Sequence, residues 1–303
     1  MSGELTTNRN KGYLFAIISA LAMSNVYIFS KAALQEVTLP QFGFYWFGVA
    51  LILLSSAIIV RKDYKVFKTM DARAFKILLI IGIVDVFSTF LFFMTIKTIE
   101  NPAIVSFLGN MKPIFVITLG FLILKETFKG IEILGLVITL TGGLILGYRP
   151  NISFQMLYDG GIIFILGSMI IGAGSMIFIR KYPIKVPSII YATSRSILLF
   201  VASMIYLIIS GHSIEIPQSA LINISLGSML GPFLAVLASY AAIKNMEVSR
   251  ISLVGTSKGV FVLIGAYLVF GKFPSTIQLV GGAITILGVI LITLGKKMKV
   301  KRK

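Results

Sequence analysis

Two lysines, Lys112 and Lys258, each stand in the middle of a long apolar stretch, at 101–124 and 249–270. A lysine at the centre of a membrane span costs roughly 2.5–3.5 kcal/mol on insertion scales, so it is rare unless it faces protein or water. Asp85 and Arg195 hold similar positions in two other apolar stretches. Three cations thus face one anion at membrane depth, which predicts a central site for a carboxylate or phosphate group.

Other side chains are predicted to complete this binding site. Small residues would leave room for a ligand, aromatic rings would form a wall, and hydroxyl or amide groups would donate hydrogen bonds. Besides Lys112, Lys258 and Asp85, the predicted binding residues are Asn25, Tyr45, Trp46, Asn110, Phe115, Tyr191, Tyr240, Thr256, Ser257 and Phe261.

Asp85 has three alternative roles. It can pair with Lys112 or Lys258 and hold helices together, accept the ammonium group of a zwitterionic ligand, or carry a coupled proton. Proline within a helix removes a hydrogen bond, so prolines in apolar stretches are candidate bending points. The residues predicted to be structural or to permit gating are Arg195, Pro113, Pro232 and Gly231.

The elements that must position these residues are membrane helices. Hydrophobic residues make up 57% of the 303-residue chain and charged residues only 13%, whereas soluble proteins average about 25% charged. The apolar residues fall in stretches of about 20, which is long enough to cross a bilayer. We predict an all-α polytopic membrane protein with ten transmembrane helices, at 12–34, 41–60, 74–96, 102–124, 130–147, 158–179, 186–209, 219–242, 249–270 and 276–295.

The net charge of +17 is distributed unevenly over the predicted loops. With the N-terminus in the cytoplasm, the outer side receives only Lys31, Lys97, Arg149 and Lys272. This bias follows the positive-inside rule, so we expect both termini in the cytoplasm. The basic tail, 297–303, is expected to rest on anionic lipid headgroups and not to bind nucleic acid.

The chain carries two similar halves. Pro40 has a counterpart in Pro187, and Ile96 one in Ile243, at the same spacing along the sequence. Five predicted spans per half is an odd number, so the second half would insert upside down relative to the first. The sequence therefore predicts two inverted five-helix repeats, 12–148 and 158–296.

Glycine recurs every seventh residue in the last predicted span of each half. These glycines are Gly135 and Gly142, then Gly281, Gly288 and Gly295. Seven residues make about two helical turns, so the glycines share one face and allow another helix to approach closely. We predict packing within the molecule, with a contact between two copies as the alternative, and hence a monomer or a weak homodimer.

Three segments resemble the drug/metabolite transporter superfamily, in its bacterial EamA-type branch. They are ALAMSNVYIFSK (Ala20–Lys31), MTIKTIENPAIVSFLGNMKPIFVITLGFLILKET (Met94–Thr127) and AAIKNMEVSRISLVGTSKGVFVLIGAYLVFGK (Ala241–Lys272). The resemblance covers nearly the whole chain. It implies a metabolite transporter of the bacterial inner membrane with a central cavity between helices 1–4 and 6–9, and amino-acid export is the commonest assignment among similar proteins.

The sequence thus predicts a secondary transporter that works by alternating access, with the midplane lysines binding the anionic group of an exported amino acid or related metabolite. The alternative is a carrier or exchanger of a purely anionic carboxylate or phosphorylated compound. The chain has no cysteine, a single histidine, His212, and no nucleotide-binding GxxxxGK[ST] motif, so we expect neither an enzyme nor a cofactor. The expected partners are a small molecule, the lipid bilayer and, as one option, a coupled proton.

Overall fold

The computed structural model describes residues 8–99, 105, 108–109, 111–128, 130–147, 161–262 and 275–294. These residues form helices joined by short turns and contain no strand, which confirms the all-helical prediction. Asn110, one of the predicted binding residues, lies outside this described part of the chain.

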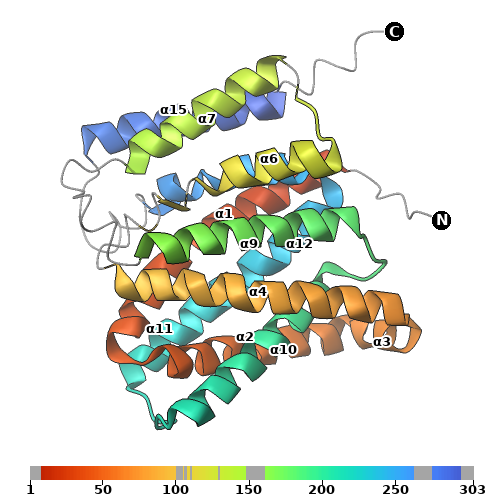
Figure 1. The fold of residues 1–303 in the computed structure, drawn as a ribbon, viewed down its shortest axis with the longest axis vertical. Coiled ribbons are helices and arrows are strands. Elements are labelled where there is room, and N and C mark those ends of the chain that lie inside the picture. Colours follow the sequence, from red (N-terminus) through yellow and green to blue (C-terminus); the bar gives the residue numbers. More distant parts are fainter. Residues whose placement is uncertain are drawn as a thin grey trace.

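The helices lie roughly parallel or antiparallel in layers (Figure 1). Their bounds are α1 Arg9–Glu36, α2 Leu39–Arg61, η1 Asp63–Lys65, α3 Val66–Thr69, α4 Ala72–Thr98, α6 Lys112–Leu124, α7 Gly130–Gly147, α9 Gly161–Lys181, α10 Ser188–Ser210, α11 Gln218–Ser228, η2 Met229–Ala235, α12 Val236–Asn245, α13 Val248–Gly255 and α15 Thr276–Leu294.

Six of the described helices are long and apolar enough to span a membrane. They are Arg9–Glu36, Leu39–Arg61, Ala72–Thr98, Gly161–Lys181, Ser188–Ser210 and Gln218–Asn245, and shorter apolar helices occupy Lys112–Leu124, Gly130–Ile145 and Leu279–Ile292. The chain is therefore a polytopic helical membrane protein, while the prediction of ten spans extends into residues outside the described part. The short helices η1 and α3, which follow α2, were not predicted.

Two of the predicted bending prolines have different local effects. Pro113 lies in the first turn of α6, where its missing N–H would have no helical partner in any case, so it starts a helix and does not kink one. Pro232 lies inside η2, a π-helical turn between α11 and α12 that keeps the span continuous. Such turns are common at functional sites.

Helices α7 and α15 pack against each other along one edge of the bundle (Figure 1). A Cβ atom added to Gly135 would lie 2.9 Å from the carbonyl oxygen of Gly288, and one added to Gly142 would lie 2.9 Å from that of Gly281. The regularly spaced glycines therefore bring the two backbones into direct contact within the molecule.

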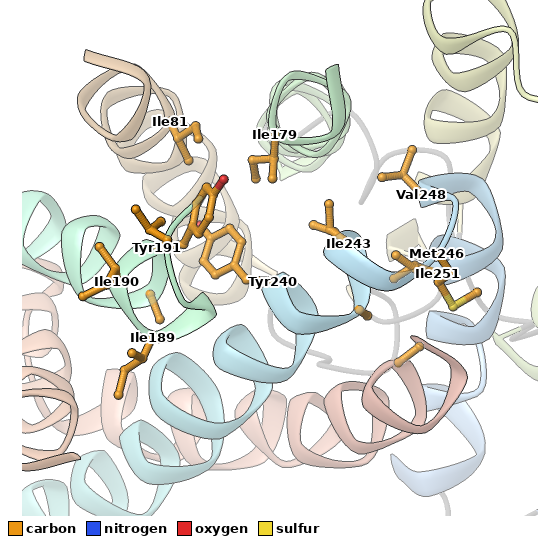
Figure 2. Packing of buried hydrophobic residues seen from close by; sticks show 14 of the residues in the cluster. Ile81, Ile179, Ile189, Ile190, Tyr191, Tyr240, Ile243, Met246, Val248 and Ile251 are labelled. Atoms are coloured by element: carbon orange, nitrogen blue, oxygen red, sulfur yellow. The ribbon is translucent and has the colours of Figure 1, made fainter. Parts of the chain in front are cut away.

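The rest of the bundle is held together at two ends by buried apolar clusters. One cluster contains Tyr13, Ile81, Tyr191, Tyr240 and Ile243, and Figure 2 shows part of it, with residues from α4, α9, α10, α12 and α13 converging. The other cluster joins α1, α2, α4 and α9 at the opposite ends of these helices. Tyr13 OH lies 3.5 Å from Ile292 O, so α1 begins on the side where α15 ends.

Candidate functional site

Lys112 and Lys258 occupy matching positions where two helices are interrupted. Met111 lies in a turn, and α6 begins at Lys112. Helix α13 is followed by a two-residue turn, 256–257, and the chain becomes helical again at Lys258. Each lysine is thus the first residue of the second helical part, close to its N-terminus.

Two backbone hydrogen bonds recur at the two interruptions, at the same separation of residues as Lys112 and Lys258. The bonds are Met111 N–H to Leu108 O (2.9 Å) and Ile114 N–H to Met111 O (3.0 Å), then Ser257 N–H to Val254 O (3.0 Å) and Val260 N–H to Ser257 O (3.0 Å). Each bond spans three residues, as in a 3₁₀ turn, and such turns within helices often mark functional hinges.

A cavity of about 260 Å³ lies beside the lysines, among α1, α4, α9, α12 and α13. Hydroxyl groups are frequent in its wall, including those of Ser19, Ser175, Ser239, Ser252 and Thr256. We call it the hydroxyl cavity.

A second cavity, of about 170 Å³, lies among α1, α2, α4, α9 and η2. Its lining includes the rings of Tyr27, Trp46, Phe47, Phe92 and Phe93, and we call it the aromatic cavity. On α1, the hydroxyl cavity borders residues from Ala16 to Met23 and the aromatic cavity borders residues from Met23 to Tyr27. The two cavities therefore lie one after the other along the bundle.

Lys112, Arg195 and Lys258 line both cavities, and we call these three residues the cationic layer. An anion that enters from either cavity reaches the same three side chains. The layer is thus placed where a site must lie if it is to be reached from both sides in turn.

Asp85 pairs with Arg195 and with neither lysine. Its Oδ2 accepts hydrogen bonds from Arg195 Nε (3.0 Å) and Tyr240 OH (2.9 Å), and its Oδ1 accepts one from Ser175 Oγ (2.7 Å). Both ion-pair partners are largely buried, with side-chain exposures of 13% and 14%. The sequence-based alternative in which Asp85 holds Lys112 or Lys258 is therefore wrong for this conformation.

Arg195 is held in place by a second contact, because its NH2 group donates to Thr89 Oγ1 at 2.8 Å. These bonds join α10 to α4, and the structural role of Arg195 stays a prediction. They also leave it in the lining of both cavities, so its charge contributes to the field that a ligand would meet.

The two lysines have a different environment. In the described part of the chain, no carboxylate lies within ion-pair distance of either ammonium group. Two glycines leave space for them, because a Cβ atom on Gly172 would lie 3.1 Å from Lys112 Nζ and one on Gly109 would lie 3.4 Å from Lys258 Nζ. Buried ammonium groups need compensation, which water or an anionic ligand can supply.

The predicted residues divide into two groups. Those that line a cavity are Lys112, Lys258, Asp85, Arg195, Trp46, Tyr240, Thr256, Pro113, Pro232 and Gly231. Those that line neither cavity are Asn25, Tyr45, Phe115, Tyr191, Ser257 and Phe261.

Most residues of the second group are engaged elsewhere. The side chain of Asn25 donates to Leu21 O of its own helix at 3.2 Å, and that of Ser257 donates to Val254 O of the preceding helix at 2.7 Å. Tyr45 OH donates to Ile214 O at 2.8 Å, near the start of α2. Tyr191 stacks on Tyr240, with ring centroids 5.4 Å apart, and Phe115 packs in the apolar clusters.

Sequence reasoning overlooked the α4 face that follows Asp85. Ser88, Thr89 and Phe92 lie one or two helical turns after Asp85 and share its side of the helix, and all three line a cavity. That spacing was a usable signal. Ser175 is held against Asp85 by helix packing, which the sequence alone does not reveal.

At one end of the bundle, contacts join the two halves of the chain. Glu126, which follows α6, accepts hydrogen bonds from Val248 N–H (3.1 Å) and from Ser249 N–H (3.2 Å) and Oγ (2.5 Å). Its carboxylate therefore caps the N-terminus of α13, where it also complements the helix dipole.

An ion-pair network lies beside this cap. Arg250 contacts Glu132 at 2.7 Å and Glu247 at 3.3 Å, and Glu247 also pairs with Arg9 at 2.5 Å. Within the described residues, no three His, Cys, Asp or Glu side chains are placed so that they could hold a metal ion.

Comparison with known proteins agrees with this architecture. The model of the EamA-like transporter family matches residues 10–148 and 159–294. An uncharacterized transporter of Haemophilus influenzae is 24% identical over 95% of this chain and 96% of its own length. The uncharacterized inner membrane transporter YhbE of Escherichia coli K12 is 24% identical over 56% of this chain and 55% of its own. A solved crystal structure superimposes with a TM-score of 0.75 at 15% identity, covering 96% of this chain and 100% of that one, and supports the fold.

Proposed function

Because the chain belongs to the EamA-like transporter family of the drug/metabolite transporter superfamily, we propose that it is a secondary transporter of a small organic anion. The anionic group binds between Lys112 and Lys258. The observation that carries this proposal is that both lysines begin a helical part after an interruption and line both cavities.

The chemistry of this arrangement suits a carboxylate or a phosphate. Lysine is a compact positive charge that binds either group, and the N-terminus of a helix adds a partial positive charge. Interrupted helices whose N-termini point at an anionic group are a known device of secondary transporters.

Two inverted repeats with alternating access are supported by the contacts between helices. Helix α1 of the first half contacts α12 and α13 of the second, and α9 of the second half contacts α4 and α6 of the first, so these contacts between the halves are equivalent. Near the two ends of the bundle, Lys31 donates to Ile96 O at 3.0 Å and Arg180 donates to Ile243 O at 3.0 Å. These carbonyls belong to the residues that the sequence pairs between the halves.

In this cycle the cationic layer is exposed first through one cavity and then through the other. We place both termini in the cytoplasm, because the basic residues are concentrated in the loops on that side. The cap by Glu126 and the neighbouring ion pairs then close the cytoplasmic end, and they must break for the hydroxyl cavity to open there.

The engagement of Asp85 favours a purely anionic substrate over an amino acid. Three donors, one of them the Arg195 guanidinium, already engage its carboxylate and compensate its charge, so a substrate ammonium would have to compete with them. The two lysines, in contrast, require no rearrangement to accept an anion. This ranks the anion carrier above the amino-acid exporter that the sequence placed first.

The proposal is tested by binding and counterflow measurements with purified protein, using labelled carboxylates and phosphorylated compounds. Lys112→Gln and Lys258→Gln should each weaken binding of the best anion at least about tenfold, since each removes a charge–charge contact. Lys76→Gln, which changes an exposed lysine at the start of α4, serves as the control. Folded lysine variants with unchanged affinity would refute the lysine site, and flux without saturation would indicate a channel.

A further inference from the structure

We infer that the aromatic cavity holds the body of the substrate, so that the transported anion carries an apolar group of about the size of one ring and no ammonium group. This inference deepens the proposed function and rests on it. It concerns what is attached to the anionic group, which the lysines alone do not determine.

A continuous wall of rings borders the aromatic cavity. Tyr27 lies edge-on to Phe92 at 5.5 Å, Phe92 to Phe93 at 5.3 Å, and Phe93 to Trp46 at 5.8 Å between ring centroids. The four rings come from α1, α4 and α2, and edge-to-face contacts of this kind fix their orientations. The wall is therefore a formed apolar surface contributed by three helices.

Close packing behind Trp46 keeps this wall in place. A Cβ atom on Gly231 of η2 would lie 3.2 Å from Trp46 Cζ2, so the indole rests directly on the backbone of that turn. The carbonyl of Trp46 also accepts a hydrogen bond from Ser228 Oγ at 2.6 Å. A preformed surface binds an apolar group at little cost in ordering.

The size of the aromatic cavity matches a single ring. Its volume is about 170 Å³, and an apolar cavity of about 150 Å³ in another protein holds benzene. The hydroxyl cavity is larger, and Tyr240 is the one aromatic residue in its described lining. Burial of an apolar group in the aromatic cavity therefore contributes more binding free energy than burial in the hydroxyl cavity.

The charges beside the wall fit an anionic end and do not fit a cationic one. Lys258 Nζ lies 5.5 Å from the centre of the Tyr27 ring, so the cationic layer adjoins the wall directly. Asp85 lines only the hydroxyl cavity, and the described lining of the aromatic cavity contains no carboxylate. A ligand with its ring at the wall would thus meet cations at its other end.

The test uses four probes with the purified full-length protein in detergent: 3-phenylpropionate, propionate, L-phenylalanine and inorganic phosphate. Calorimetric titration should show that 3-phenylpropionate binds about 10- to 100-fold more tightly than propionate, because burial of a phenyl group contributes that much. L-Phenylalanine should bind at least about tenfold more weakly than 3-phenylpropionate, because its ammonium finds no free carboxylate.

Variants separate this inference from the proposed function. Phe92→Ala should reduce the affinity for 3-phenylpropionate about tenfold and leave the affinity for propionate unchanged. Phe87→Ala removes the same side chain from a position on α4 that is 61% exposed and should change neither affinity. Lys258→Gln should weaken the binding of 3-phenylpropionate and of propionate by similar factors.

The inference is overturned if propionate or phosphate binds as well as 3-phenylpropionate, or if Phe92→Ala has no effect. It is also overturned if L-phenylalanine binds as tightly as 3-phenylpropionate, or if 3-phenylpropionate shows no saturable binding. If propionate or phosphate binds as well as 3-phenylpropionate but binds more weakly to Lys258→Gln, the proposed lysine site is still supported.

Discussion

The pairing of Asp85 with Arg195 can be tested by a double-mutant cycle. The two groups lie 3.0 Å apart and both are largely buried. Charges about 4 Å apart attract by about 4 kcal/mol at an effective dielectric constant of about 20. Removing one partner of such a pair costs about 3–5 kcal/mol, because the other charge remains buried without compensation.

We therefore expect Asp85→Asn and Arg195→Gln each to lower the free energy of unfolding by about 3 kcal/mol. The double variant should lose much less than the sum, which gives a coupling energy of about 2–3 kcal/mol. Asparagine keeps the shape of the side chain but has one acceptor oxygen, so it can replace only one of the two carboxylate oxygens that accept from Ser175 and Tyr240. The double-mutant cycle is therefore needed to isolate the charge pair.

The assay is reversible unfolding by sodium dodecyl sulfate in mixed micelles, followed by circular dichroism. A parallel cycle combines Asp85→Asn with Lys112→Gln. If Asp85 held Lys112, as one alternative from the sequence proposed, the large coupling would appear in that second cycle, and a third cycle with Lys258→Gln tests the other lysine in the same way. A coupling below about 0.5 kcal/mol between Asp85 and Arg195 would refute the pairing, because exposed or distant pairs give values of that size.

Two further predictions concern closure and packing. Glu126→Gln removes the charge that caps α13, so the hydroxyl cavity should open more often towards the cytoplasm. In membrane vesicles, a Ser239→Cys reporter in this cavity should then react several-fold faster with a membrane-impermeant maleimide added from the cytoplasmic side, and the chain contains no other cysteine. An unchanged rate would contradict the assignment of this end as the closed gate. Gly142→Ala should destabilise the protein by about 1–3 kcal/mol in the same unfolding assay, because its methyl group would press on the α15 backbone. Gly174→Ala, with open space at the Cβ position, is the matched control. Equal stability of the two variants would contradict the close α7–α15 contact.

The sequence predicted which charged residues come together more successfully than it predicted how they pair. A charge within an apolar stretch is visible in one dimension, and this identified Lys112, Lys258, Asp85 and Arg195 together. The partner of Asp85 depends on how α4, α9 and α10 are rotated about their axes, which a sequence does not specify. The depth of a residue within a membrane span is therefore predictable from the sequence, whereas the direction of its side chain is much less so.

The misplaced candidates have the same physical origin. Tyr45 lies one residue before Trp46 on α2, and a step of one residue turns a helix by about 100°. Trp46 consequently lines the aromatic cavity, while the hydroxyl of Tyr45 reaches Ile214 O in the connection before α11. Thr256 and Ser257 divide in the same way, since only Thr256 lines a cavity.

The two halves of the chain share backbone geometry around the lysines but differ in the surfaces they offer to a substrate. The tight turns at Met111 and Ser257 share two backbone hydrogen bonds, so the two halves present lysines in similar local geometry. The ring wall is contributed by α1, α2 and α4 alone, all within the first half. If the halves rock against each other, the apolar body stays with the first half throughout the cycle. The contacts that change during transport are then those of the second half, Lys258 among them. The first half would select the apolar group of the substrate, and the second half would control the release of its anionic group.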